Sequence, residues 1–240
     1  ITFLKSNAPL ALFVVLNEIF VFPSNACAIE RMKVLFVMTF DFDNIEAKVP
    51  IIVDMTLALA FMITKLSGVI LLEPKVFEDE RGFFFESYQK QLFTNAGISL
   101  DFVQDNHSRS RRETLRGLHY QVQQPQGKLV RVVSGEIFDV AVDLRRTSPT
   151  FGEWVGFYLS ADNKKQMWIP PGFAHGFYVV SEWAEMLYKT TDYYAPKWER
   201  TLLWNDPSIG VQWPLVDGKA PLLSPKDAVG ALLNKAETFD

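Results

Sequence analysis

Short apolar segments alternate with turn-forming residues from about residue 66 to the C-terminus, and this punctuation constrains the fold more than any other feature. The separators are glycine, proline and clusters of Asx or Ser. Short apolar segments with such boundaries are typical of β-strands. The pattern therefore predicts an all-β fold, either a sandwich, a jelly roll or a barrel. The predicted strands span residues 69–73, 83–88, 102–106, 114–121, 128–133, 136–144, 154–160, 165–169, 175–180, 184–191 and 201–204.

The segment "GEIFDVAVDL" has the alternation of a half-buried strand. One face carries apolar side chains and the other carries both aspartates, which is the pattern of a strand with one face in water. The preceding "SG" at 134–135 predicts a hairpin turn. Two short helices are also predicted, over residues 87–97 and 224–236. The first face holds Phe138, Val140, Val142 and Leu144, and the second holds Ile137, Asp139, Ala141 and Asp143.

Residues 1–61 differ in character, because they contain none of the chain's 13 glycines. Their apolar runs are shorter than the roughly 20 residues that a membrane-spanning helix needs, and the first is broken by Asn17 and Glu18. A signal peptide is also disfavoured, because no basic region precedes that run. We interpret residues 1–61 as an atypical extension, mis-assigned or poorly ordered, and expect residues 62–240 to form the functional domain. Deleting the extension should leave activity intact.

Composition limits the possible partners and compartments. The single cysteine, Cys27, excludes an intrachain disulfide and a cysteine-based zinc cluster, and it suits a reducing compartment, so a cytoplasmic location is expected. A net charge of -4 gives no general attraction to nucleic acid or to anionic lipid. An anionic ligand would therefore require a local cluster of positive side chains.

The stretch "TLRGLHYQ" places His119 within a predicted strand, where it is a core residue, a metal ligand or a proton-transfer group. A metal site in a β-barrel often has ligands at i and i+2, and here the second position is Gln121, a poor ligand. Proton transfer needs one imidazole, a group that orients it and an acid elsewhere. Arg116 and Lys128 lie close in sequence and suit an anionic substrate or a developing oxyanion, although each is more often a solvated charge.

The spacing of Arg116 and His119 conflicts with this hypothesis in a regular strand. The two residues are separated by an odd number of positions, so their side chains would point to opposite faces. Gly117, which lies between them, would permit a bulge that brings both into one cavity. The predicted site depends on that irregularity.

Eight separate blocks, in order between about Lys65 and Ala228, resemble the dTDP-4-dehydrorhamnose 3,5-epimerase family. The resemblance implies an all-β cupin jelly roll and an isomerase that epimerises dTDP-4-keto-6-deoxy-D-glucose at C3 and C5 without a metal or other cofactor. "PPGFAH" fits the second cupin motif, whereas the first has lost its second ligand at Gln121. The blocks are "VFEDERGFFFESY" (76–88), "FVQDNHS" (102–108), "LRGLHYQ" (115–121), "QGKLVRVVSGEIFDVAVDLR" (126–145), "SPTFGEWVGFYLS" (148–160), "MWIPPGFAHGF" (167–177), "LYKTTDYY" (187–194) and "LLWNDPSIGVQWPL" (202–215).

The resemblance implies a role for each catalytic residue. His119 is expected to be the base, with Asp227 as its orienting partner, although the residues alone favour a helix N-terminal carboxylate at position 227. Tyr188 is expected to be the acid on the opposite side of the sugar, and Lys128 to stabilise the enolate oxygen. Because tyrosine has a pKa near 10, we expect nearby cations, Lys128 among them, to bring the pKa of Tyr188 closer to the working pH.

The resemblance also implies the substrate contacts and a homodimer. Arg81 and Arg116 are expected to contact the phosphates or the sugar. The segment 76–88 is expected to contribute to the neighbouring subunit's site, so that Arg81 and Glu86 act across the interface. For Phe77 and Tyr194, the residues alone predict core packing. The expected nucleoside contacts are Phe77, Glu86, Gln104, Asn106, Tyr194 and Glu199, and His175 and Lys226 complete the substrate site.

Three rival hypotheses remain. A related epimerase could act at C3 or C5 alone, and product stereochemistry would distinguish it. A catalytically silent cupin could bind a nucleotide-sugar, but it would not need His119, Lys128 and Tyr188 together. A membrane-tethered form could use residues 1–61 as an anchor, which fractionation would test.

Overall fold

The computed structural model of the chain describes residues 11–14, 36–39, 51–52 and 59–240. Most of the N-terminal segment, with the apolar runs considered above, lies outside the described residues. Within the described ranges, no helix has the length and apolar character that crossing a bilayer requires. The division of the chain at residues 61 and 62 therefore stays a prediction.

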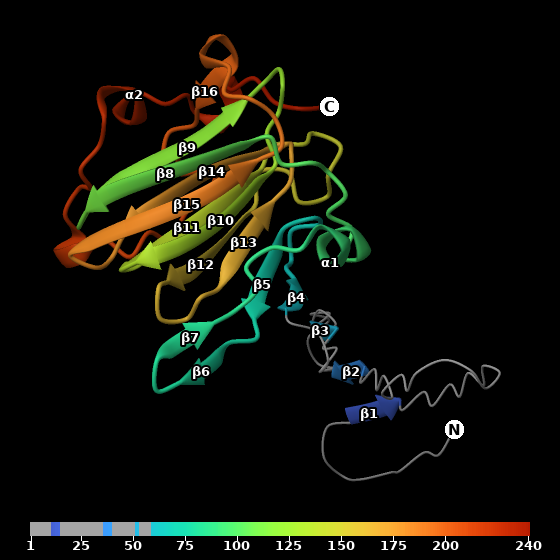
Figure 1. Cartoon of the computed structure of the whole chain (residues 1–240). Helices are drawn as coiled ribbons and strands as arrows, with labels where there is room; N and C mark the ends of the chain where they lie inside the picture. Colours follow the sequence, from blue (N-terminus) through green and yellow to red (C-terminus); the bar gives the residue numbers. More distant parts are fainter. Residues whose placement is uncertain (1–10, 15–35, 40–50, 53–58) are drawn as a thin grey trace, which may run out of the picture.

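Two antiparallel sheets face each other and form the body of the molecule (Figure 1). The all-β prediction is confirmed. The larger sheet has seven strands, in the order β3 (Ile51–Ile52), β4 (Leu59–Ile63), β5 (Ile70–Pro74), β13 (Gln166–Ile169), β10 (Lys128–Ser134), β15 (Trp183–Thr190) and β8 (Gln104–Arg111). The smaller has five, in the order β12 (Trp154–Ser160), β11 (Glu136–Asp143), β14 (Phe173–Val179), β9 (Leu115–Gln121) and β16 (Glu199–Thr201).

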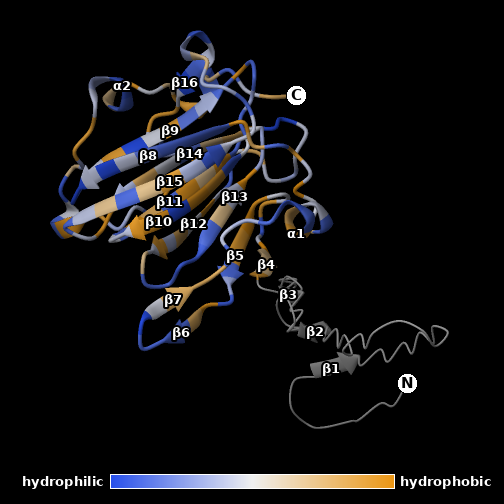
Figure 2. Cartoon of the chain, viewed as in Figure 1, coloured by the Kyte–Doolittle hydropathy of each residue, from blue (hydrophilic) through white to orange (hydrophobic). Residues whose placement is uncertain are grey.

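Apolar side chains from both sheets meet between them in one core. Val130 and Met186 of the larger sheet pack with Ile137, Ala141 and Phe177 of the smaller sheet. Figure 2 shows the apolar residues concentrated along β10, β11 and β12, while hydrophilic residues dominate β8 at the edge of the larger sheet. The core therefore fills one part of the sandwich and leaves a more polar region towards β8 and β9.

The predicted half-buried character of strand 136–144 is wrong, because both faces of β11 are buried. The face with Phe138 and Val140 is covered by the C-terminal segment, which contributes Trp213 and Phe239 to a second apolar cluster. Local alternation predicted the two faces correctly, but it could not show that a segment about 70 residues further along the chain would cover the apolar one. The face that carries the aspartates is directed towards the other sheet.

Asp143, at the end of β11, is buried but well paired. Arg145 Nη2 lies 2.7 Å from Asp143 Oδ2, and the hydroxyls of Ser148 and Thr150 donate to the same oxygen. Burial alone would raise the pKa of Asp143, but these hydrogen bonds lower it to about 2. The carboxylate therefore stays charged at neutral pH and fixes the loop that follows β11.

The predicted hairpin at residues 134–135 is also wrong. β10 and β11 are joined tightly, but they belong to different sheets. Gly135 has a φ of +73°, and a Cβ placed on it would lie 1.9 Å from the carbonyl oxygen of Trp183. The glycine therefore lets the chain cross from one sheet to the other in a space that no side chain could share.

Residues 83–88 do not form the single strand predicted for them. Instead β6 (Phe77–Asp79) and β7 (Gly82–Phe84) form a hairpin, which projects from the body of the molecule (Figure 1). The turn contains Gly82 with a φ of +133° and an Asp79–Arg81 ion pair. Residues Phe77, Phe83 and Phe84 are 51%, 60% and 69% exposed.

The remaining strands match their predictions within a few residues, with three differences. β8 begins at Gln104 and continues to Arg111, and β16 lies at Glu199–Thr201, which overlaps the predicted 201–204 only at Thr201. β4 was not predicted, and the proposed domain start at Met62 lies inside it. Outside the body, β1 (Ala11–Val14) pairs with β2 (Phe36–Thr39).

The first helix prediction is confirmed by α1 (Lys90–Asn95), which is followed by Gly97 with a φ of +88°. The second is largely wrong, because residues 224–236 contain a four-residue helix, α2 (Pro225–Ala228), and a short 3₁₀ turn. Ala231 pairs with backbone groups of Thr201 and Leu203 instead of continuing the helix. The 3₁₀ turns are η1 (Pro196–Trp198), η2 (Val216–Gly218) and η3 (Leu233–Lys235).

Candidate active site

A cavity of about 590 Å³ lies at the end of the sandwich where β9, β16 and α2 meet. It brings together side chains from both sheets and from the C-terminal segment. Most of the predicted site residues line it, namely Gln104, Asn106, Arg116, His119, Lys128, His175, Tyr188, Tyr194, Glu199, Lys226 and Asp227.

His119 and Asp227 are in direct contact, although 108 positions separate them in the sequence. His119 Nε2 lies 2.5 Å from Asp227 Oδ1. The side chain of Asp227 is 3% exposed and that of His119 is 21% exposed. With Nε2 donating to the carboxylate, Nδ1 carries the lone pair of a neutral imidazole. The pair therefore has the geometry of a base with its orienting partner.

The surroundings keep this imidazole neutral and the carboxylate charged. Burial lowers the pKa of His119, Asp227 opposes that effect, and the positive charges of Lys226 and Lys128 lower the pKa further. Burial alone would raise the pKa of Asp227, but the hydrogen bonds from His119 and Ser224 bring it below its usual value. A neutral imidazole beside a carboxylate is the form that can accept a proton.

Ser224 is a site residue that the sequence analysis missed. Its hydroxyl donates to Asp227 Oδ2 at 2.7 Å, and its Oγ caps α2 by accepting from the Asp227 amide. The serine and the histidine thus hold the two carboxylate oxygens in place. The pattern Ser-x-x-Asp, typical of a helix N-terminus, was the signal that could have identified it.

The predicted bulge at Gly117 is present between β9 and β14. His119 is paired with His175 and Arg116 with Phe177, so three steps on one strand face two on the other. Arg116 and His119 consequently both line the cavity. Arg116 Nε donates to Ser110 Oγ at 2.9 Å, which directs its guanidinium along the cavity wall near β8.

Gly117→Ala should disrupt this bulge and with it the site. Gly117 has a φ of +124°, and an added Cβ would lie 2.5 Å from Gly176 Cα and 2.7 Å from the carbonyl oxygen of His175. Backbone atoms cannot move aside cheaply, so we expect a loss of about 3 kcal/mol or more in unfolding free energy. Urea denaturation would measure it, with Gly218→Ala as a control because that site is open. Equal stability of the two variants would contradict the role given to the bulge.

Lys128 lines the cavity and is buried, with 9% of the residue exposed. Its Nζ lies 3.4 Å from the carbonyl oxygen of His119. Burial lowers the pKa of Lys128 to about 8, although Asp139 and Glu199 oppose the change. The pKa of the amine is therefore close to neutral pH, and its protonation can respond to a negative charge that develops in the cavity.

Asp139 and His175 form a second buried pair, and Asp139 was not predicted as a site residue. His175 Nε2 lies 2.7 Å from Asp139 Oδ1, and the side chains are 8% and 0% exposed. Within the described part of the chain, Asp139 Oδ2 has no hydrogen-bond partner. Its charge acts on Lys128. An aspartate in the middle of a strand, with apolar residues on both sides, was the signal in the sequence.

The expectation that nearby cations bring the pKa of Tyr188 closer to the working pH is wrong. Burial raises the pKa of Tyr188, and the cation that most opposes this is Arg116 rather than Lys128. The phenol therefore remains fully protonated at neutral pH. That state still suits a proton donor, since an acid must carry its proton before the reaction.

Polar side chains at the mouth of the cavity are linked to one another. Tyr194 Oη donates to Glu199 Oε2 at 3.2 Å, and Lys226 Nζ lies 2.9 Å from both oxygens of Glu199. Gln104 Nε2 donates to Asn106 Oδ1 at 2.9 Å. Tyr194 is 51% exposed, so the core packing predicted from the residues alone is wrong.

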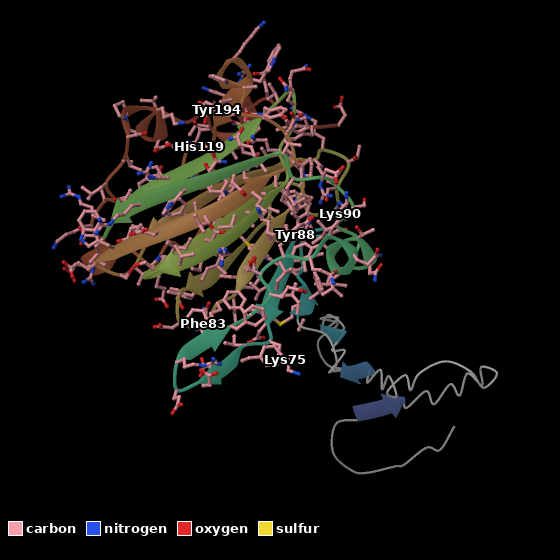
Figure 3. All side chains as sticks on the ribbon, viewed as in Figure 1. Lys75, Phe83, Tyr88, Lys90, His119 and Tyr194 are labelled. Carbon is pink, nitrogen blue, oxygen red and sulfur yellow. The ribbon has the colours of Figure 1, made fainter. Side chains whose placement is uncertain are left out.

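Phe77, Arg81 and Glu86 do not reach this cavity within one chain. Phe77 and Arg81 belong to the β6–β7 hairpin, which projects from the opposite end of the sandwich (Figure 1). Figure 3 shows Phe83 of the same hairpin far from His119 and Tyr194. The prediction that Arg81 and Glu86 act in a neighbouring subunit requires a second copy of the chain and stays a prediction.

Position 121, where a metal-binding cupin motif has a ligand, is occupied by a glutamine whose amide group is already hydrogen-bonded. Gln121 Nε2 donates to the carbonyl oxygens of Gln124 and Tyr193, and its Oε1 accepts from the Ala195 amide. Among the described residues, no group of three or more His, Cys, Asp and Glu side chains gathers as a metal site.

The arrangement can move protons at carbon atoms beside a carbonyl. The His119 imidazole, held by a carboxylate, can accept a proton, the protonated Tyr188 phenol can donate one, and Lys128 in the same cavity can stabilise an oxyanion when it is charged. Arg116 and Lys226 add positive charge that suits an anionic substrate.

Comparisons with known proteins agree with this chemistry. Residues 63–235 match the family model described as dTDP-4-dehydrorhamnose 3,5-epimerase. A protein of that name from Pseudomonas aeruginosa is 64% identical over 175 residues, which cover 72% of this chain and 96% of the relative. One from Salmonella typhimurium is 58% identical over 175 residues, covering 72% and 94%.

Two solved structures are similar to this one. The Legionella pneumophila dTDP-6-deoxy-D-glucose-3,5-epimerase in complex with dTDP-4-keto-L-rhamnose has a TM-score of 0.72 and 53% identity, covering 75% of this chain and 95% of that one. A 3'-monoepimerase from Streptomyces bikiniensis in complex with dTDP-quinovose has a TM-score of 0.67 and 32% identity, covering 71% and 86%.

Proposed function

The chain belongs to the dTDP-4-dehydrorhamnose 3,5-epimerase family, and from this premise we propose that its cavity residues perform the epimerisation in the roles given below. The protein is an isomerase with a cupin jelly-roll fold. It epimerises dTDP-4-dehydro-6-deoxy-D-glucose at C3 and C5, giving dTDP-4-dehydro-L-rhamnose. The observation that carries the residue roles is the His119–Asp227 pair, which shares one cavity with Lys128 and Tyr188.

The C4 ketone of the substrate acidifies the protons on both neighbouring carbons. His119 Nδ1 takes the proton from C5 or C3 on one face of the sugar, and the electron pair of the broken C–H bond moves into an enolate. Asp227 stabilises the imidazolium, and Lys128 stabilises the negative charge on O4. Tyr188 then donates its proton to the same carbon from the opposite face, which inverts its configuration, and proton exchange with solvent restores both groups.

The remaining cavity residues bind the nucleotide. Arg116 and Lys226 contact the diphosphate, as guanidinium and ammonium groups commonly do. Tyr194 stacks on the thymine, and Glu199 holds both Tyr194 and Lys226. Gln104, Asn106 and His175 complete the lining of the substrate site.

The pH profile of kcat/KM should be bell-shaped. His119 must be neutral, and its lowered pKa keeps it neutral to pH values below the usual titration range of histidine. Lys128 must be charged, and with a pKa of about 8 it is charged below that pH and loses its charge above it. We therefore expect kcat/KM to fall about tenfold per pH unit once the pH exceeds the pKa of Lys128, which forms the alkaline limb of the profile. Lys128→Arg, which stays charged, should remove that limb, and an unchanged limb would exclude Lys128 as its origin.

Two copies of the chain pair, so that the β6–β7 hairpin of one reaches the cavity of the other. The exposed aromatic rings of the hairpin and its distance from its own cavity support this proposal. Sedimentation equilibrium tests the dimer. Mixing Arg81→Ala with His119→Ala subunits tests the exchange, because one site of each mixed dimer would recover both residues. No recovery in a mixture that forms mixed dimers would contradict it.

The compartment of the enzyme is the cytoplasm. The single cysteine, Cys27, supports a reducing environment. Fractionation of cells that express the full chain tests this location, and recovery with the membranes would instead favour an anchoring role for residues 1–61.

Proton exchange tests the function directly. The full chain is incubated with dTDP-4-keto-6-deoxy-D-glucose in D₂O, and C3 and C5 are followed by NMR. Deuterium and inverted configuration at both carbons are expected. Inversion at one carbon would indicate a single-centre epimerase, an activity that the Streptomyces bikiniensis neighbour has by name. Binding of dTDP without any exchange would indicate a silent nucleotide-sugar cupin.

A further inference from the structure

Gln121 lies next to two residues of the cavity lining, Glu199 and Tyr194. It is the last residue of β9, two residues beyond His119 and therefore on the same face of the strand. It is 4% exposed. In the sheet it is paired with Glu199 of β16, which contacts Tyr194.

The amide of Gln121 joins two loops that are far apart in sequence. Its Nε2 donates to the Gln124 carbonyl at 2.7 Å and to the Tyr193 carbonyl at 3.2 Å, and its Oε1 accepts from the Ala195 amide at 2.8 Å. Both amide protons are therefore used. Because the side chain is buried, losing these bonds would leave backbone groups without partners.

Tyr194 lies between Tyr193 and Ala195, whose backbone carbonyl and amide are hydrogen-bonded to the Gln121 side chain. A second glutamine also supports it, because Gln104 Oε1 accepts from the Tyr194 amide at 3.0 Å. The ring is half exposed at the cavity mouth, yet its backbone is fixed on three sides. Figure 3 shows Tyr194 and His119 at the same end of the molecule, with Tyr194 near β16.

An exposed aromatic ring on a fixed backbone is a preorganised stacking surface. A free loop would have to lose conformational freedom when a ligand binds, and that loss weakens binding. Fixing the loop in advance removes this cost without any contact between the fixing residue and the ligand.

We propose that Gln121 is a positioning residue for nucleotide binding, which acts by holding Tyr194 in the place where it stacks on the base. This inference rests on the proposed function, in which Tyr194 contacts the thymine. Replacing Gln121 should raise KM for the dTDP-sugar and Kd for dTDP about tenfold. The value of kcat should change much less, because His119, Lys128 and Tyr188 keep their places.

Three variants separate positioning from a general loss of stability. Gln121→Met keeps the length of the side chain and removes every hydrogen bond, and Gln121→Glu keeps the acceptor for Ala195 while losing both donors. Tyr120→Phe is the matched control. It lies on the same strand and removes a buried side-chain bond of 2.7 Å to the Glu237 carbonyl, but on the face away from the cavity. Thermal unfolding, kcat, KM and calorimetric binding of dTDP are measured for each.

The expected result is a raised KM and Kd in both Gln121→Met and Gln121→Glu, because neither side chain can donate as the amide does to the carbonyl oxygens of Gln124 and Tyr193, with wild-type values in Tyr120→Phe. A lowered melting temperature with unchanged KM in Gln121→Met, as in the control, would overturn the proposal. If Gln121→Met does not fold, Gln121→Glu decides on the same criterion.

A double-variant cycle tests whether Gln121 acts through Tyr194. If it does, Gln121→Met should cost dTDP affinity in the wild type and almost none in a Tyr194→Ala background. Equal losses in both backgrounds would overturn the inference. The proposed function is tested separately by the wild type: if it binds dTDP and exchanges protons, an unaffected Gln121 variant contradicts this inference alone.

Discussion

His119→Ala should reduce kcat/KM by about 10³-fold or more and abolish deuterium incorporation at C3 and C5. The imidazole is the base in the proposed mechanism, and general-base catalysis alone contributes about 10²–10⁴-fold. The substitution also removes the partner of Asp227, whose carboxylate lies 2.5 Å from His119 Nε2 in a buried position. Exchange measured by NMR in D₂O reports on the chemical step, and calorimetric binding of dTDP reports on the nucleotide end of the cavity, which should be little affected.

His107→Ala is the matched control for this variant. His107 also lies on a strand and contacts a carboxylate, with Nε2 3.0 Å from Glu185 Oε2, but its side chain is 56% exposed and does not line the catalytic cavity. Since removing His119 leaves a buried carboxylate without its partner, His119→Gln, which retains an N–H donor, provides a second test with less destabilisation. Substantial exchange in a folded His119→Gln protein would show that another group is the base.

The sequence allowed the fold class to be predicted because strand formation leaves a local pattern. Alternating apolar residues and glycine-rich turns can be recognised within a window of about ten residues. The strand at 154–160 was predicted with its observed bounds. The choice of sheet is not local. Gly135 lies between two strands as in a hairpin, but β10 pairs with β15 and β11 pairs with β14, and these partners lie far along the chain and in different sheets.

Burial was predicted less well than the strands themselves, for the same reason. The outer face of β11 is buried because Trp213 and Phe239 of the C-terminal segment pack on it. The same segment was predicted as a helix up to residue 236, yet its residues instead pair with the backbone beside β16. A segment that completes a sheet-covering layer takes its conformation from that layer rather than from its own propensity.

Most residues that line the candidate site were predicted, but its electrostatics were not. Resemblance to a family named the residues, and the odd spacing of Arg116 and His119 led to the bulge that the structure contains. Asp139 was missed because its significance depends on His175 across the sheet and on Lys128 from the other sheet. The pKa of Tyr188 was expected to fall but is raised, since burial, which no sequence pattern reports, outweighs the nearby cations.

Tyr188→Phe should separate proton removal from inversion. The phenol is half-buried in the cavity wall and protonated at neutral pH, and in the proposed mechanism it donates to the face opposite His119. Without its hydroxyl, the enolate can still form, and His119 can return a proton to the face from which it came. We therefore expect product formation to fall about 10²–10⁴-fold, while deuterium enters C3 or C5 with retained configuration at a rate that falls much less.

The measurement for Tyr188→Phe compares deuterium content and stereochemistry in the same NMR time course. Tyr158→Phe is the control, because Tyr158 lies on β12 outside the cavity and is 47% exposed. If exchange and inversion fall by the same factor, Tyr188 is not the acid that protonates the second face, and its hydroxyl would instead serve binding or the first proton transfer. If inversion is unaffected, a solvent molecule or another cavity residue supplies the proton. Exchange without inversion would require that the two faces are served by different groups, with His119 on one side of the sugar and Tyr188 on the other.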